Sequence, residues 1–203
     1  MPTDETPDRG SEGESNTEAA ILTFLEERDY DAAMSTALHA YGGEILGFLC
    51  ATMRDPNDAD DAYAAGCHDA WRGIETYRAQ STFRAWLYGV FRNAASRFYR
   101  DAFRKRRVPF SRTPASTLVA LDRTRTRPFL KTDVKNAFRE LRASLPAFDQ
   151  ELLVLRIDRA LSWNEIADIL APEGAPSPAG LRKRFERLKG RVRELALERG
   201  LLK

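Results

Sequence analysis

The chain has 203 residues, of which 43% are hydrophobic, and a formal net charge of only +2 at neutral pH. This length suits one ordinary domain or two small ones. No apolar run is long enough to span a bilayer and the acidic start is unlike a secretion signal, so we expect a cytoplasmic protein without a membrane partner.

Charge is unevenly distributed along the chain. Residues 1–18 are acidic with Arg9 as their one cation, whereas residues 97–107 and 182–193 are strongly basic. The small net charge therefore hides two basic patches, a distribution typical of nucleic-acid-binding proteins.

The sequence lacks the usual signatures of catalysis. Its two cysteines and two histidines have no metal-ligand spacing, and there is no phosphate-binding glycine loop or pairing of nucleophile with base. We therefore expect a protein that is not an enzyme, binds no metal or other cofactor, and has no small-molecule substrate.

The N-terminal half is predicted to be a helical bundle that follows an acidic tail. Residues 1–17 are rich in Pro, Gly, Ser and acids and have almost no large apolar side chain, so we expect disorder there. Helical periodicity then begins at Glu18 and continues in a second helix over 31–54. A third helix is expected over 58–77, capped by Asn57 or Asp58, and a fourth from the loop 80–82 to about Arg106. Four successive helices without a strand pattern predict an all-α domain at 18–107.

The C-terminal half is also predicted to be helical. Residues 108–131 contain three prolines and no sustained periodicity, which predicts a flexible linker. Helices are expected from Thr132 or Asp133, over 148–158, over 163–170 and over 179–198. Ser162 and Glu165 form a capping box before the third of these, and a turn with Pro and Gly precedes the basic last helix. Short helix, turn and basic helix predict a helix-turn-helix domain at 132–203.

Aromatic rings and arginines alternate most densely in residues 71–107. Phe83, Trp86 and Phe91 share one helical stripe, so we expect them in the core. The loop before Phe83 and the remaining arginines are then available to stack on unpaired bases and to bind phosphates. Nucleic acid is the expected partner.

Two segments resemble bacterial sigma factors of the two-domain, extracytoplasmic-function group. The family pattern of an aromatic residue, a small loop, Phe, Trp-Leu, and a helix with Asn and Arg is matched by Tyr77, Ser81, Phe83, Trp86, Leu87, Asn93 and Arg100. In the second segment, Leu145-Pro146 and the run from Leu161 to Ala167 match the family's Leu-Pro turn and its Leu-Ser-x-x-Glu-Ile-Ala pattern. The resemblance covers roughly residues 20–107 and 132–197.

The resemblance implies a protein that joins core RNA polymerase, directs it to promoter DNA and helps to open the duplex. The first domain is expected to hold the single-stranded minus-ten element, with one base flipped into the loop before Phe83. The candidate residues are Tyr77, Arg78, Gln80, Ser81, Thr82, Arg84, Arg92, Asn93 and Arg100. Asp60 and Asp61 resemble acids that face the polymerase, although acids near a helix start also suit the helix dipole.

The second domain is expected to read the duplex minus-thirty-five element with its basic helix. Because a helix turns about 100° per residue, the cations cannot all face the DNA. The candidates near the helix start are Arg182, Lys183, Glu186 and Arg187, and the other cations are expected to bind phosphate. Members of this group are commonly restrained by an anti-sigma factor, so such a partner is also implied.

The sequence departs from the family at two places. Ala64 and Cys67 stand where the family commonly has Gln and an aromatic residue for the polymerase clamp, and residues 172–178 lengthen the turn before the basic helix. The alternative is a stand-alone helix-turn-helix regulator whose N-terminal bundle senses a signal or dimerises. That alternative leaves the aromatic and arginine pattern of residues 71–107 unexplained.

Overall fold

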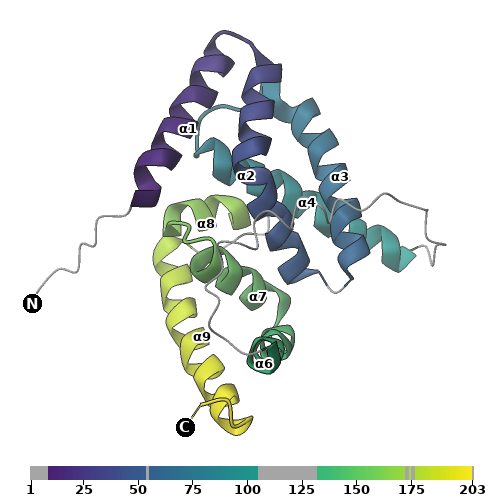
Figure 1. Cartoon of the computed structure of the whole chain (residues 1–203), viewed down its shortest axis with the longest axis vertical. Helices are drawn as coiled ribbons and strands as arrows, with labels where there is room; N and C mark the ends of the chain where they lie inside the picture. The colour runs from purple at the N-terminus through teal and green to yellow at the C-terminus, as the bar shows by residue number, and fades with distance from the viewer. Residues whose placement is uncertain (1–8, 54, 105–131, 172–173, 175–176, 203) are drawn as a thin grey trace, which may run out of the picture.

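The computed structural model describes residues 9–53, 55–104, 132–171, 174 and 177–202, and this part of the chain contains helices and no strand. The N-terminal helices are α1 (Arg9–Glu26), α2 (Tyr30–Thr52), α3 (Pro56–Gly73) and α4 (Phe83–Arg104), with a short 3₁₀ turn η1 (Ile74–Thr76) after α3. The C-terminal helices are α6 (Thr132–Ala143), α7 (Ala147–Leu153), α8 (Trp163–Leu170) and α9 (Pro178–Glu198). Figure 1 shows the first group above the second. The predicted all-α fold class is confirmed.

The first helix begins earlier than its periodicity predicted. α1 starts at Arg9 rather than near Glu18, so residues 9–17 of the expected tail are helical. Once a helix is nucleated by packing, each added residue gains one backbone hydrogen bond, which favours extension even without apolar side chains. The Thr17 hydroxyl also donates to the Gly13 carbonyl at 3.0 Å. Residues 1–8 and the expected linker 108–131 lie outside the described residues.

Two local features place α2 and α3 against each other. Gly42 does not interrupt α2, and a Cβ at this position would lie 2.6 Å from the Tyr63 hydroxyl of α3, so the missing side chain permits close approach. Asp55 caps α3 by accepting from the Asn57 amide at 2.9 Å, and Pro56 takes the first helical position. The cap is therefore Asp55, not Asn57 or Asp58, because proline is preferred directly after a cap.

One buried apolar cluster runs through both halves of the molecule. It contains Phe83, Tyr88 and Phe91 of α4 together with Leu152 of α7 and Ile166 of α8. Phe83 and Phe91 are fully buried, as predicted, and Trp86 is half-buried against the same cluster. Because α8 packs on both α4 and α9, the two groups of helices share an interface.

Gly66 of α3 faces the ring of Phe91, and a Cβ at Gly66 would collide with that ring. We expect Gly66→Ala to lower the free energy of unfolding by about 1–2 kcal/mol, because overpacking costs about 1–3 kcal/mol and alanine returns up to about 1 kcal/mol of helix propensity. Urea denaturation measures the difference. Gly89→Ala is the matched control, since nothing lies within 4 Å of a Cβ there. Equal stabilities of the two variants would contradict the packing argument.

α7 continues into a π-helical turn, η3 (Val154–Asp158), rather than a regular helix to Asp158. The Arg159 amide donates to the Val154 carbonyl at 3.0 Å, five residues back. Ala160 follows with a positive φ of 54°. The turn places the Arg159 carbonyl 3.2 Å from Nη2 of Arg84 in α4.

Candidate nucleic-acid interface

The loop between η1 and α4 is fixed by Tyr77. Its hydroxyl donates to the Ser81 carbonyl at 2.6 Å, and its ring packs on Phe83 and Trp86 with centroid distances of 5.0 and 5.6 Å. Burial, followed by the nearby Glu18 carboxylate, raises the pKa of Tyr77 to about 12, so the phenol stays a neutral donor. Tyr77 therefore fixes the conformation of the loop from the side that faces the core.

The rest of the loop presents amide, hydroxyl and guanidinium groups. Ala79 has a φ of 53°, a left-handed conformation that non-glycine residues seldom adopt. Gln80 beside it is exposed, while the Arg78 guanidinium donates to the carbonyls of Glu75 and Tyr77 at 2.9 and 3.2 Å. Hydrogen bonds within the segment thus fix the loop backbone, and the Gln80 side chain is left accessible to a ligand.

Two side chains cap the start of α4. Thr82 accepts from the Ala85 amide at 3.1 Å, so α4 begins directly after the loop 80–82. Glu18 of α1 accepts from the amides of Phe83 and Arg84 at 2.8 and 2.9 Å. A carboxylate at a helix N-terminus is favoured by the helix dipole. Sequence reasoning missed Glu18, because it lies 65 residues from Phe83 and no local pattern joins them.

Arg84 and Arg92 lie inside the protein, with 7% and 3% of their surface exposed. Arg84 donates through Nε and Nη2 to the two carboxylate oxygens of Glu44 in α2, both at 2.7 Å. Arg92 donates through Nε to Glu151 of α7 at 2.9 Å. Their roles as DNA ligands stay predictions; in this structure carboxylates hold both guanidinium groups.

Asn93 and Arg100 are exposed and share one side of α4, being seven residues apart. Arg97 forms an ion pair with Asp69 of α3. The accessible part of the predicted minus-ten site therefore combines the loop with this outer side of α4. Asp60 and Asp61, the expected polymerase contacts, are half-buried on α3.

The four residues expected to read duplex DNA lie on one exposed face of α9. Leu181, Phe185 and Leu188 point into the core with at most 5% exposure. The exposed side chains between them include Arg182, Lys183, Glu186 and Arg187.

Two arginines near the start of α9 contact aromatic rings. Arg182 lies 6.0 Å from the centroid of the Trp163 ring. Arg184 is held instead by Asp149, at 2.6 Å, and by the Phe148 ring, at 4.2 Å from its centroid. Arg184 thus points toward α7 and away from the exposed face. The start of α9 itself is capped by Ser177, which accepts from the Gly180 amide at 3.3 Å.

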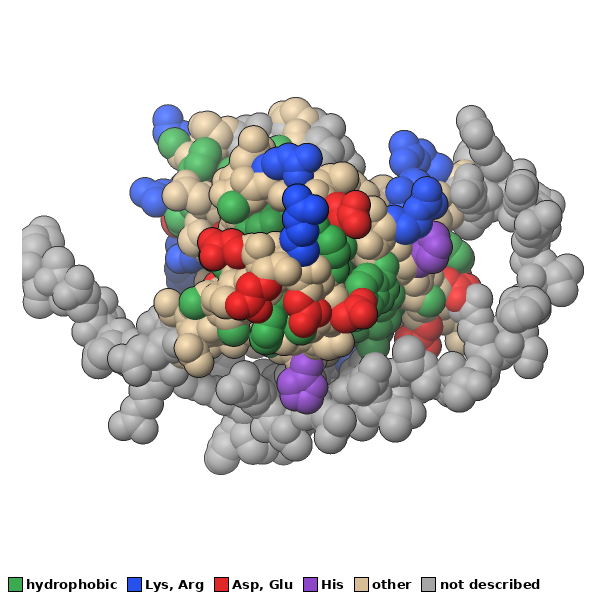
Figure 2. Space-filling model, turned by 90° about the horizontal axis from the view of Figure 1, so that it is seen from above, with side chains coloured by type: hydrophobic (Ala, Val, Ile, Leu, Met, Phe, Trp, Pro, Cys, Tyr) green, Lys and Arg blue, Asp and Glu red, His purple; other side chains and the backbone are tan. Residues whose placement is uncertain are grey.

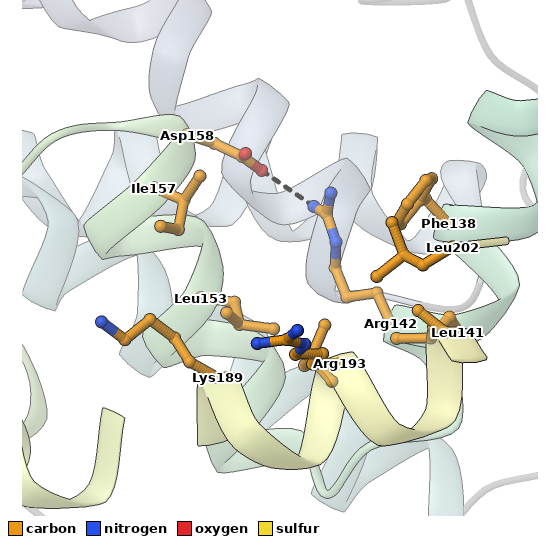
Figure 3. Close-up of a pocket in the computed structure, with 11 residues that line it drawn as sticks. Phe138, Leu141, Arg142, Leu153, Ile157, Asp158, Lys189, Arg193 and Leu202 are labelled. Atoms are coloured by element: carbon orange, nitrogen blue, oxygen red, sulfur yellow. Dashed lines mark hydrogen bonds and ion pairs between the residues drawn. The ribbon is translucent and has the colours of Figure 1, made fainter. Parts of the chain in front are cut away.

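An apolar groove of about 470 Å³ lies between α6, η3 and α9, and Figure 3 shows Phe138, Leu141 and Leu202 directed toward it. The ion pair between Arg142 and Asp158, at 2.8 Å, crosses its edge. The lining includes Lys189 and Arg193 of α9 but none of the four candidate base-reading residues, so the groove is separate from the predicted DNA-reading face.

Charge alone does not mark one continuous DNA surface. Figure 2, seen from the N-terminal helices, shows acidic side chains across the middle of that face, with basic ones beside them and at its sides. Within the described ranges, no helix is long and apolar enough to cross a bilayer, and no group of His, Cys, Asp and Glu is placed to hold a metal ion.

Comparison with known proteins gives matches in sequence and in structure. Residues 37–106 match the family of sigma-70 region 2, a span that includes the loop before α4 and the whole of α4. RNA polymerase sigma factor YlaC of Bacillus subtilis (strain 168) is 28% identical over 131 residues, which is 64% of this chain and 75% of that protein.

A solved structure is also similar. The co-crystal structure of the sigma factor RpoE with the anti-sigma factor NepR from Bartonella quintana matches with a TM-score of 0.57 at 18% identity. The match covers 83% of this chain and 96% of that one. At this identity the likeness concerns the fold, and it extends beyond region 2 to the C-terminal helices.

Proposed function

We propose that this chain is a sigma factor of the extracytoplasmic-function group, which binds core RNA polymerase, recognises minus-ten and minus-thirty-five promoter elements, and promotes opening of the duplex. We further propose two functional domains, 18–107 for the minus-ten element and 132–203 for the minus-thirty-five element, joined by 108–131.

The observation that carries this proposal is the loop before α4. It lies within the sigma-70 region 2 match, its backbone is closed by Tyr77 and Arg78, and the Gln80 side chain projects from it into solvent. An amide can read a base edge, and a base flipped against a preformed loop offsets the few kcal/mol lost on unstacking. Strand capture by this loop would stabilise the open duplex.

The test is transcription in vitro with sigma-free core polymerase and a promoter-fragment library, with transcript starts mapped. We expect defined starts only when the protein is present. Gln80→Ala with Ser81→Ala should reduce opening at those promoters about 10- to 100-fold, because base-edge contacts are worth about 1–3 kcal/mol.

The matched control carries alanine at the exposed residues Glu26 and Glu27, and should initiate like the native protein. Absence of both core binding and initiation would overturn the sigma function. If the protein in that case still bound duplex DNA, the stand-alone regulator would be favoured. Unchanged opening by the loop variant would remove the loop from base capture.

On α9, the expected base-reading and phosphate-binding roles are separable. Arg187→Ala should weaken binding to a selected minus-thirty-five duplex about tenfold and relax its sequence preference, since a base contact is worth about 1–3 kcal/mol. Arg191→Ala should weaken all duplexes similarly and lower the slope of log affinity against log salt by about one. Fluorescence anisotropy across salt concentrations measures both. The same salt slope and selectivity for the two variants would contradict the assignment.

An anti-sigma factor is the third proposed partner. The structurally similar RpoE was solved with one bound, and the present chain shares that fold over most of its length. Co-purification from the native cells with a tagged copy, followed by inhibition of transcription in vitro, tests this part.

A further inference from the structure

Helices of the C-terminal half cover part of the surface that we propose binds the single strand. The Thr82 hydroxyl donates to Oε1 of Glu165 in α8 at 3.1 Å. Nε and Nη2 of Arg92 both lie 2.9 Å from Oε2 of Glu151 in α7. Two candidate minus-ten residues therefore bind carboxylates that are distant in sequence.

The same contact has an apolar centre. α8 packs between α4 and α9, and its Ile166, Ile169 and Leu170 are at most 1% exposed. At one edge, Arg84 donates to the Arg159 carbonyl that follows η3, at 3.2 Å. Apolar centre and polar edge are usual for contacts between domains, which tend to be mobile unless large and strongly hydrophobic.

Glu151 competes directly with a phosphate for Arg92. A carboxylate and a phosphodiester present the same kind of oxygen acceptors, and one guanidinium fork satisfies either by charge-assisted hydrogen bonds. Arg92 is only 3% exposed and its guanidinium group is bonded to Glu151. DNA can therefore reach this cation only after α7 moves.

The duplex-reading face is not covered in the same way. Arg182, Lys183, Glu186 and Arg187 are all exposed on α9 while the contact between the halves is made. The arrangement thus blocks one proposed DNA surface and leaves the other open.

We propose that this arrangement is an autoinhibited state, in which Glu151 and Glu165 occupy polar groups that bind the single strand once the C-terminal half moves away. The inference rests on the proposed function, because it concerns the same minus-ten surface. Inhibition is confined to strand capture, and duplex recognition by α9 remains available to the closed chain.

The first test is Glu151→Gln in the full chain, which keeps the side-chain shape and removes the charge. The probe is a short fluorescein-labelled single-stranded DNA of mixed sequence, measured by anisotropy, because stacking and backbone contacts tolerate sequence. We expect about tenfold tighter binding than for the native chain, a change of about 1.4 kcal/mol. Asp158→Asn is the matched control: it removes the same charge from the C-terminal half, where Asp158 faces Arg142. Duplex affinity should stay equal in both.

The second test locks the halves together. Gly47 of α2 lies next to the Arg159 guanidinium, and neither residue is among the proposed DNA-binding residues. In a Cys50→Ser, Cys67→Ser chain, Gly47→Cys and Arg159→Cys are joined by a bismaleimide with a cleavable disulfide spacer. We expect locking to weaken single-strand binding about tenfold or more, duplex binding to persist, and cleavage to restore the affinity of the unlocked chain.

Three results would overturn the inference. The first is failure of the cysteine pair to crosslink in the free protein, which would mean that the closed state is absent. The second is equal single-strand affinity for the native, Glu151→Gln, locked and cleaved chains, which would mean that closure does not inhibit single-strand binding. If none binds the single strand, alone or with core polymerase, the minus-ten assignment fails as well, and the transcription assay separates that case from a failure of autoinhibition alone.

Discussion

Replacing Arg84 with alanine is expected to lower the free energy of unfolding by about 3–5 kcal/mol, because removing one partner of a buried ion pair leaves the other uncompensated. The Glu44 side chain is only 19% exposed and meets the guanidinium through both carboxylate oxygens at 2.7 Å. Arg84 also donates to the Arg159 carbonyl, so truncation loosens the contact between the halves too. Urea denaturation followed by circular dichroism measures the loss.

Two further variants isolate the ion pair. Arg84→Lys keeps the charge but not the planar fork, so it should recover only part of the stability. Combining Arg84→Ala with Glu44→Ala should destabilise by less than the sum of the single changes, since both remove the same interaction. A loss below about 1 kcal/mol for Arg84→Ala is the value of an exposed pair and would contradict burial of this one.

Replacing Glu18 with alanine is the second large effect, with an expected loss of about 3 kcal/mol. The change removes two charge-assisted hydrogen bonds, worth about 1.5–3 kcal/mol each, from the amides of Phe83 and Arg84. The first turn of α4 then has unsatisfied donors next to the loop. Amide hydrogen exchange at Phe83 and Arg84 should accelerate along with the drop in stability.

Tyr41→Phe is the matched control for Glu18. The Tyr41 hydroxyl donates to the same carboxylate at 3.1 Å, so its removal should cost about 1 kcal/mol and leave the α4 amides protected. If Glu18→Ala leaves exchange at Phe83 unchanged, the helix start is held by Thr82 alone and the role given to α1 is wrong.

The helices were predictable because their signals are local. Periodicity placed Phe83 and Phe91 in the core, and a hydroxyl followed three residues later by a carboxylate marked Ser162 and Glu165 as a capping box, which the structure contains with bonds of 3.2 and 2.9 Å. Where neighbouring residues offered the same chemistry, as around Asp55, the position of the cap was uncertain by two or three residues. The early start of α1 also escaped prediction, since helix extension needs no apolar pattern.

The candidate site was only partly predictable, because it depends on contacts between distant segments. The sequence indicated arginines on α4 but not that Arg84 and Arg92 would point into the protein. Their partners, Glu44 and Glu151, lie far from them in the sequence, and no local pattern links the pairs. Glu165 was identified only as a capping residue, yet its second oxygen binds Thr82. On α9, by contrast, one helix decides which residues are exposed, and periodicity placed Arg182 and Arg187 correctly on the outer face.

The π-helical turn η3 has a consequence for insertions and deletions in this part of the chain. A π turn accommodates one residue more than an α-helix of similar rise, so shortening Val154–Asp158 by one residue would restore α-helical phase. The residues after the deletion would then keep their direction relative to α7, because the extra residue is what widens the turn. In a regular α-helix, by contrast, each residue removed rotates the following chain by about 100°. The contacts that Glu151 and the Arg159 carbonyl make with α4 should therefore tolerate the loss of one residue from this turn.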